Sequence, residues 1–218
     1  LLFGKQGQRR TLLNIGGISN VTIVTGLAAD TLAYDIGPGN CMIDEAVRYF
    51  TGGKKTYDRN GALARSGNVD SSFLKALLVH PFLKKRPPKS TGREVFGESY
   101  TKSILAKHPG LTQEDAAATL TEFSAEVIAR SIRVHEVDEV IVSGGGAKNI
   151  FMMERLIQKL QGNETVVNLS SVYGIPEDSK EALCFAVLGY LSLNRLHGNV
   201  PVATGATHSV VLGKISLP

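Results

Sequence analysis

Three consecutive glycines lie between a strand pattern and a helix pattern, and they constrain the fold of this sequence most. The β-branched run Val140-Ile141-Val142 precedes them, and apolar residues at helical spacing follow over 150–160. Gly144, Gly145 and Gly146 each lose about 0.5–1 kcal/mol more than alanine on ordering. This cost predicts a close approach of another group to the backbone. Because the amides and dipole of a helix N-terminus favour anions, we expect a nucleotide there.

The composition indicates a globular protein with one sizeable core. The chain has 218 residues, 43% hydrophobic and 20% charged, with a net charge of +4, typical of soluble proteins. The basic clusters 54–55 and 84–86 lack interleaved aromatic residues, so we interpret them as surface charge and expect no nucleic-acid partner. No apolar run reaches the roughly 18–20 residues that span a membrane. Without a secretory signal pattern, a cytoplasmic protein is expected.

Strand and helix patterns alternate along most of the chain. Strands are predicted over 11–15, 20–25 and 31–35, and a helix follows from about 40 to the glycines at 52–53. Residues 53–110 carry little regular pattern and are interpreted as a loop-rich insertion with short helical pieces such as 71–79. The remaining predictions are a helix over 112–137 capped by Thr112, a strand over 139–143, a helix over 148–161, a strand over 165–169 and a helix over 179–195. The predicted fold class is therefore α/β, a ribonuclease-H-like (actin-like ATPase) domain whose mixed sheet has three antiparallel strands before the alternating helices and strands.

The two cysteines each lie in an apolar, helix-like stretch. Cys41 precedes Met42-Ile43, and Cys184 lies within Leu183-Cys184-Phe185-Ala186. Both are expected to be buried free thiols. Their separation gives neither a disulfide framework nor a metal-ligand spacing.

The segment Asn14–Asn20 joins the first two predicted strands through two glycines. Gly16 and Gly17 expose backbone amides, and Ser19 and Asn20 add side-chain donors. Amides converging from a tight turn can hold a phosphate oxygen. A simple hairpin turn that needs positive φ is the equal alternative.

The segment Asp35–Asn40 ends the third predicted strand and opens a helix. Asp35 stands where a strand-end carboxylate could hold a magnesium-bound water. Gly37 and Gly39 would let a ligand reach the helix N-terminus that begins near Asn40. The alternative is a strand-to-helix turn in which Asp35 or Asn40 only caps the helix.

Two further segments carry polar groups with less definite roles. Residues 87–94 are stiff, basic and rich in hydroxyls; they either line a polar substrate pocket or form a rigid surface turn containing the Arg93–Glu94 pair. They lack the complete Gly-x-x-x-x-Gly-Lys-Ser/Thr loop. Glu181 lies beside the apolar face of the last predicted helix, where an acid is costly to bury without a partner or a metal.

Taken together, six segments in order give the chain a family resemblance. It resembles the anhydro-N-acetylmuramic acid kinases, sugar kinases of the actin-like ATPase superfamily, through residues 13–20, 35–40, 87–94, 144–149, 180–182 and 198–206. The resemblance implies an enzyme that uses ATP and Mg²⁺. Such an enzyme opens the 1,6-anhydro bridge of the sugar with water and phosphorylates the freed 6-hydroxyl. It also implies a small anhydro sugar and a nucleotide as partners.

The resemblance also assigns roles to residues of this sequence. It makes 14–20 the second phosphate loop and 144–149 the adenosine motif, and it places 35–40 beside the γ-phosphate and the sugar. Asp35 would then be a metal contact, and Glu181 a catalytic or metal contact near the reacting centre. The implied nucleotide contacts are Asn14, Gly16, Gly17, Ser19, Asn20, Gly37, Gly39, Asn40, Gly144, Gly145, Gly146 and Asn149.

The resemblance covers 1–218 as the C-terminal domain of such a kinase. The family's first phosphate loop, and the aspartate of an Asp-Phe-Arg-like segment thought to activate water, have no counterpart here. We therefore expect this polypeptide alone to be inactive, since phosphoryl transfer needs both halves of the cleft. An isolated half would expose its cleft face, which makes a homodimer plausible.

Other functions compete with this one. A levoglucosan kinase shares most of the six segments, although the stretch 198–206 favours the muramic-acid sugar. A catalytically incomplete nucleotide-binding module is a second alternative. A chaperone-type ATPase is a third, and the segment 87–94 argues against it.

Overall fold

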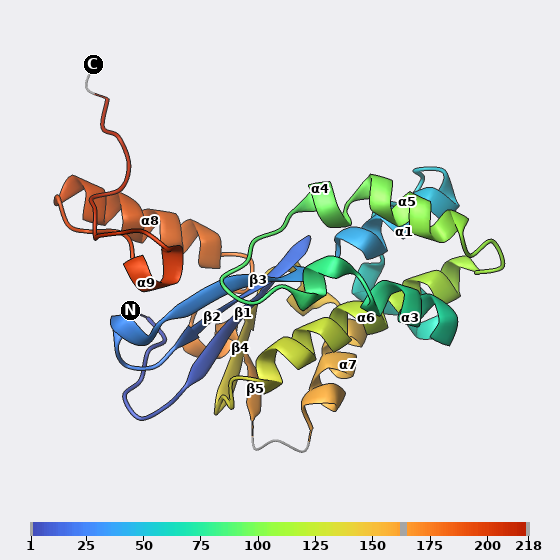
Figure 1. The fold of residues 1–218 in the computed structure, drawn as a ribbon, viewed down its shortest axis with the longest axis horizontal. Coiled ribbons are helices and arrows are strands. Elements are labelled where there is room, and N and C mark those ends of the chain that lie inside the picture. Colours follow the sequence, from blue (N-terminus) through green and yellow to red (C-terminus); the bar gives the residue numbers. More distant parts are fainter. Residues whose placement is uncertain (1, 162–164, 217–218) are drawn as a thin grey trace.

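A five-stranded mixed sheet forms the centre of this computed structural model, which describes residues 2–161 and 165–216 (Figure 1). The strand order is β3-β2-β1-β4-β5. β1, β2 and β3 pair antiparallel, whereas β4 pairs parallel with β1, and β5 parallel with β4. This topology confirms the predicted fold class. The strands are Arg10–Ile15, Ile18–Val24, Leu32–Pro38, Glu139–Ser143 and Val166–Leu169.

The first two strands are buried on alternate residues, because only one face of the sheet packs against helices. β4, which lies between β1 and β5, is buried along its whole length. Two boundaries differ from the predicted ones. β2 begins earlier and β3 continues through Pro38, because Ile18 pairs with Pro38 and Ser19 with Gly37 across the ladder. The turn between β1 and β2 is thus reduced to Gly16 and Gly17.

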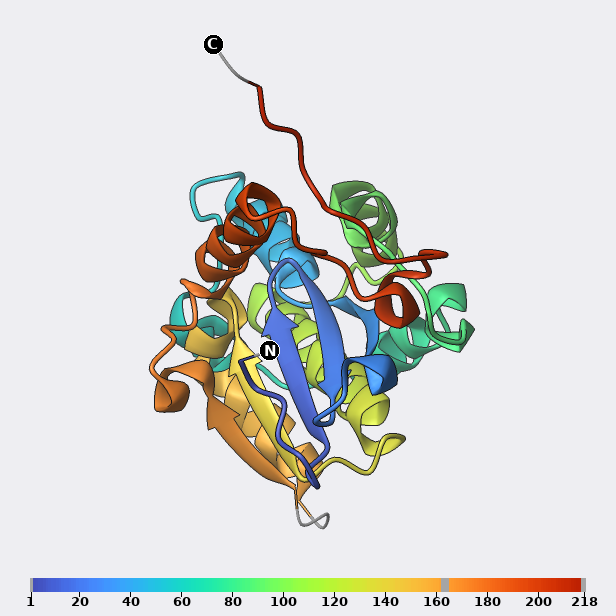
Figure 2. The same ribbon diagram turned by 90° about the vertical axis from the view of Figure 1, so that its left-hand side faces the viewer.

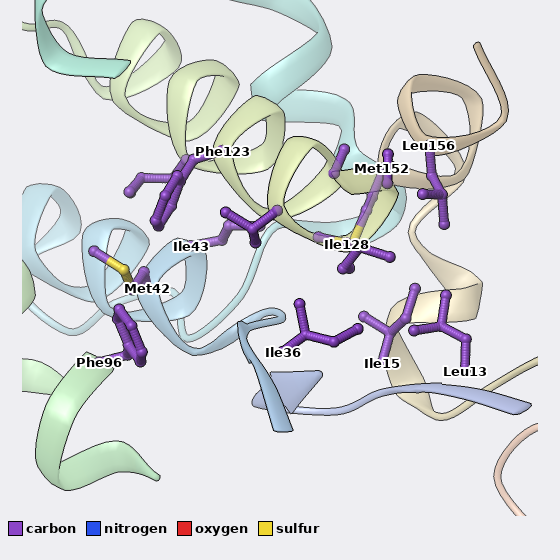
Figure 3. Close-up of a cluster of buried hydrophobic side chains, with 14 of the residues drawn as sticks. Leu13, Ile15, Ile36, Met42, Ile43, Phe96, Phe123, Ile128, Met152 and Leu156 are labelled. Atoms are coloured by element: carbon purple, nitrogen blue, oxygen red, sulfur yellow. The ribbon is translucent and has the colours of Figure 1, made fainter. Parts of the chain in front are cut away.

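Three helices cover the apolar face of the sheet: α1 (Cys41–Thr51), α6 (Gln113–Arg133) and α7 (Ile150–Leu160). Figure 2 shows the sheet in front, with α6 and α7 behind it. α6 begins as predicted, because the Thr112 hydroxyl accepts a hydrogen bond from the Asp115 amide at 3.0 Å. The core joins side chains of all three helices to the sheet (Figure 3), among them Leu13, Ile15, Ile36, Met42, Ile43, Phe123, Ile128, Met152 and Leu156.

Residues 53–110 contain more helix than the loop-rich insertion that the sequence predicted. They form α2 (Ala62–Ser66), α3 (Ser71–Leu78), α4 (Arg93–Phe96) and α5 (Glu98–Ala106), with 3-10 turns at Arg59–Gly61 and Pro81–Lys84. Phe73, Leu77 and Phe96 are fully buried in the common core. The predicted helical piece 71–79 is present as α3, whereas α2, α4 and α5 are too short to be recognised from periodicity and depend on tertiary packing.

The C-terminal part differs most from expectation. α8 (Lys180–Leu193) forms where predicted, but none of its residues is buried, and it lies apart from the helical layer (Figure 1). The prediction of a buried Cys184 is therefore wrong, whereas the prediction for Cys41 is confirmed. An apolar sequence predicts burial, but the described residues leave much of this helix exposed, although the Ser192 hydroxyl donates a hydrogen bond to the Leu212 carbonyl. Phe185 is 67% exposed and Tyr190 63%.

A short η1 turn (Ala28–Asp30) precedes β3, and the η5 turn (Ser170–Tyr173) and α9 (Pro201–Thr204) complete the described elements. Within the described ranges, no helix combines the length and hydropathy that crossing a bilayer would take.

Candidate functional site

The glycine triplet lies between β4 and α7 but does not enter the helix directly. Gly144 has a φ of +89°, and the 3-10 turn η4 (Gly145–Lys148) follows it. α7 begins only after Asn149, whose side-chain oxygen accepts a hydrogen bond from the Met152 amide at 3.0 Å. The helix predicted from residue 148 therefore starts at 150, because Asn149 is its N-cap.

The three glycines have different surroundings. A Cβ on Gly144 would lie 2.6 Å from the Ile15 carbonyl oxygen, and one on Gly146 would lie 2.2 Å from Ile15 Cγ2. A Cβ on Gly145 would meet nothing within 4 Å. Gly144 and Gly146 thus permit close packing on the end of β1, and only Gly145 leaves room for a ligand.

Gly145 opens onto a cavity of about 310 Å³, here called the α1–η4 cavity. Asn40 at the start of α1 and Asn149 at the start of α7 line it as well. The structure thus brings together three residues that the sequence assigned to nucleotide binding from two distant segments. The other lining residues are Ile43, Asp44, Tyr57, Asp58, Arg59, Asn60 and Lys148.

Two charged groups of this cavity are already engaged. The Asp58 carboxylate accepts hydrogen bonds from the amides of Leu63 and Ala64, each at 2.9 Å. Lys148 Nζ lies 2.8 Å from Asp178 Oδ2. Asp44, by contrast, makes no side-chain hydrogen bond or ion pair within residues 2–161 and 165–216. Its carboxylate is therefore available to a ligand.

Asp44 is also electrostatically unusual. Burial raises the pKa of its carboxyl to about 6, against the opposing positive charges of Arg48 and Arg93. The nearby acids Glu45 and Asp58 add to the rise. A carboxyl with such a pKa changes charge just below neutral pH, so ligand binding at this cavity is expected to depend on pH.

The β1–β2 turn is bonded to the start of α1. The amides of Asn40 and Cys41 donate to the carbonyls of Gly16 and Gly17 at 2.9 and 3.0 Å, and the Gly39 amide donates to Gly17 at 2.9 Å. A Cβ on Gly39 would lie 2.4 Å from the Gly16 oxygen, which explains the glycine. The amides of Asn40 and Cys41 are therefore already hydrogen-bonded, although the sequence suggested that a ligand could reach the start of this helix. The Gly17 amide itself has no acceptor in the described part of the chain.

Other predicted contacts lie around the same turn. Ser19 is fully buried, and its hydroxyl donates to the Gly37 carbonyl at 3.1 Å. This bond gives Ser19 a structural role, so its contact with a nucleotide stays a prediction. Asn14 lies near the end of β1, and its Oδ1 is 3.5 Å from Ser143 Oγ.

Asn20 and Asp35 line a second cavity of about 390 Å³, here called the β3 cavity. The Asp35 carboxylate accepts hydrogen bonds from Ser90 Oγ at 2.7 Å and from the Thr91 amide at 2.9 Å. Asp35 therefore fastens the segment 87–94 to β3, and Ala203 and Thr204 of α9 complete the wall.

The residues proposed for metal binding do not form a cluster. No group of three or more His, Cys, Asp or Glu side chains in the described ranges is placed to hold a metal ion. Glu181 is exposed at the start of α8 and lines neither cavity. The catalytic or metal role of Glu181 therefore stays a prediction.

Sequence reasoning missed Asp44 and residues 57–60 of the α1–η4 cavity. Asp44 follows Asn40 by four residues, so both lie on one face of α1, and this spacing could have identified it. Residues 57–60 reach the cavity only through tertiary packing, and no local pattern marks them.

Comparisons with known proteins show the family to which the chain belongs. The family model for anhydro-N-acetylmuramic acid kinase matches residues 1–218, and the chain belongs to that family. The Streptomyces coelicolor protein named anhydro-N-acetylmuramic acid kinase is 43% identical over 204 residues, which cover 94% of this chain and 51% of the relative. The Bacillus thuringiensis subsp. konkukian relative of the same name is 38% identical over 225 residues. The matched region covers all of this chain and 58% of the relative.

The chain thus spans about half the length of the curated relatives it matches. A more distant similarity links it to the solved structure of the activator of 2-hydroxyisocaproyl-CoA dehydratase from Clostridium difficile with bound ADPNP. That structure has a TM-score of 0.46 and 16% identity, covering 77% of this chain and 57% of the other.

Proposed function

We propose that this chain forms the nucleotide-holding part of an ATP-dependent anhydro-N-acetylmuramic acid kinase. The reaction opens the 1,6-anhydro bridge of the sugar with water and transfers a phosphoryl group from ATP to the freed 6-hydroxyl. Family membership supports the class of reaction. In this proposal the α1–η4 cavity takes the adenosine, and the β3 cavity borders the sugar.

The meeting of Asn40, Gly145 and Asn149 on one cavity is the observation that carries the proposal. Gly145 lets a flat group approach the backbone, because nothing occupies the position of its missing Cβ. Asn40 and Asn149 bring amide groups, and Asp44 brings an acceptor for hydroxyl groups. Ile43 and Tyr57 add apolar surface beside these polar groups, and such a mixture suits a nucleoside.

Magnesium is part of the proposed reaction, and Asp35 is the residue we expect to hold it. Mg²⁺ in phosphoryl-transfer sites is held by one or two carboxylates together with substrate phosphates and water. The donor set of Asp35 fits this role, because Oδ2 accepts the bonds from Ser90 and Thr91. Oδ1 has no partner within the described residues. When bound, the ion would neutralise charge on the phosphates.

Nucleotide binding is tested by filling the cavity from Gly145. Gly145→Leu places a side chain where a Cβ meets nothing within 4 Å, so the fold should tolerate it while adenosine and ATP lose their place. Gly110→Leu is the matched control, because Gly110 is exposed with equally open space and lies outside the cavity. Calorimetric titration with ATP should show binding in the unsubstituted chain and the control only. Equal binding by both variants would refute the assigned cavity.

The reaction itself is tested in a chimera. Residues 1–218 replace the matching segment of the Streptomyces coelicolor relative, and ADP release is followed with 1,6-anhydro-N-acetylmuramic acid and with levoglucosan. The expected product is a 6-phosphorylated, ring-opened amino sugar, identified by its mass. Faster turnover on levoglucosan would transfer the proposal to the competing substrate.

A further inference from the structure

The side chain of Arg93 lies against the glycine turn between β1 and β2. A Cβ built on Gly17 would lie 3.5 Å from Arg93 Nε and 3.5 Å from Nη2, so the edge of the guanidinium group borders the turn. Burial raises the pKa of Cys41 and of Asp44, and the positive charge of Arg93 opposes both rises, which places Arg93 near the first turn of α1.

Arg93 is held from both sides. Two residues earlier, the Thr91 amide donates to Asp35 on β3 at 2.9 Å. Three residues later, Phe96 is fully buried, and its carbonyl accepts a hydrogen bond from Cys41 Sγ at 3.2 Å. The backbone of Arg93 is therefore fixed to the sheet and to α1, and its position over Gly17 follows from the fold.

The guanidinium group has no anionic partner of its own. Arg93 is exposed, and its side chain makes no ion pair and no hydrogen bond within residues 2–161 and 165–216. Its neighbour Gly17 offers a backbone amide that likewise lacks an acceptor there. Five guanidinium donors in a planar fork next to an unused amide match the oxygens of a phosphate.

We propose that Arg93 binds the terminal phosphoryl group of the nucleotide, beside the Gly17 amide of the turn already assigned to the phosphates. This inference rests on the proposed function for the identity of the ligand, but the anion site itself depends only on Arg93 and the glycine turn. Arg93 thereby orients the phosphates of a nucleotide whose adenosine occupies the α1–η4 cavity.

The test compares Arg93→Ala with Arg133→Ala in the 218-residue chain, using ATP, AMP and inorganic tripolyphosphate. Arg133 is the matched control, because it is an exposed arginine at the end of α6 that lines neither cavity. Arg93→Ala should weaken ATP and tripolyphosphate about tenfold or more, since hydrogen bonds to charged groups are strong. AMP affinity should stay at its unsubstituted value, and Arg133→Ala should leave all three ligands unaffected.

Two further measurements separate binding from folding. Arg93→Lys keeps the charge but loses the fork, so its ATP affinity should fall between those of Arg93 and Arg93→Ala. The backbone amide resonance of Gly17 should shift when tripolyphosphate is added to the unsubstituted chain but not to Arg93→Ala, with equal thermal unfolding midpoints for both proteins.

The outcomes distinguish the two proposals. If tripolyphosphate binding depends on Arg93 but no nucleotide binds, the result supports the anion site and refutes the assignment of the α1–η4 cavity to adenosine. Equal losses for ATP and AMP in Arg93→Ala, or unchanged ATP affinity, overturn the role of Arg93. Absence of tripolyphosphate binding to the unsubstituted chain overturns it as well.

Discussion

Gly146→Ala should destabilise the fold far more than the same change one residue earlier. The new Cβ would lie 2.2 Å from Ile15 Cγ2, 2.7 Å from Ile15 Cβ and 3.0 Å from the Ile15 carbonyl oxygen. Carbon atoms in contact need about 3.5–4.0 Å, so β1 or η4 must move by more than about 1 Å. Ile15 is fully buried and hydrogen-bonded within the sheet, which leaves little room to move. Overpacking of this kind costs about 1–3 kcal/mol, and we expect the upper end.

Gly145→Ala is the internal control, because its Cβ meets nothing within 4 Å. Its free energy of unfolding should stay within about 0.5 kcal/mol of the unsubstituted value. The chain has no tryptophan, so urea unfolding is best followed by far-ultraviolet circular dichroism, with an unchanged m value as the test that only stability changed. Equal urea midpoints for the two variants would refute the packing role of Gly146.

Three further predictions concern the Asp44 carboxyl, the Thr112 helix cap and the hydrogen bonds of Asp35. Burial raises the pKa of Asp44 from its ordinary value of 3.8 to about 6, so the folded state binds this proton more tightly than the unfolded state, and stability falls as pH rises from about 4 to 6. Asp44→Asn removes this loss of stability. The pKa shift corresponds to about 3 kcal/mol, and because partial exposure to solvent reduces this figure, we expect a gain of about 1 kcal/mol at pH 7. An unchanged pH profile of urea midpoints would contradict this prediction. Thr112→Ala loses the 3.0 Å cap bond to the Asp115 amide and should cost about 1 kcal/mol in the same assay; no loss would show that the cap is dispensable. Asp35→Ala releases Ser90 and Thr91, so the Thr91 amide should exchange its hydrogen about tenfold faster, unless another acceptor holds it.

The sequence predicted the elements whose patterns are local. Alternating apolar residues identified β1 and β2, the run Val140-Ile141-Val142 identified β4, and helical spacing identified α1, α6 and α7. It did not predict α5 or the full helical content of 53–110, because those short helices depend on the burial of residues such as Phe96, Ile104 and Leu105 by distant elements. The same limit applies to α8, whose composition indicates burial although the described structure leaves it exposed.

The candidate site was predicted in part for the same reason. Strand-to-helix junctions identified Asn40, Gly145 and Asn149, and the sheet brings these junctions to one edge, where they line one cavity. Asp44 was not singled out, and Arg93 was considered only as part of the segment 87–94, because the significance of both residues lies in the absence of a partner. Neither finds a side-chain partner in the described ranges, and the absence of a partner cannot be inferred from residue spacing.

The glycine-rich segments serve packing before they serve a ligand. Gly144 and Gly146 allow η4 to lie on Ile15, and Gly39 allows the start of α1 to lie on Gly16. These contacts hold β1, β4 and α1 together at one edge of the sheet, whether or not a nucleotide is bound. Gly145 and the Gly17 amide are what remains accessible to a ligand. Substitutions in the first group should therefore change stability, and substitutions around the second should change nucleotide affinity with little effect on stability.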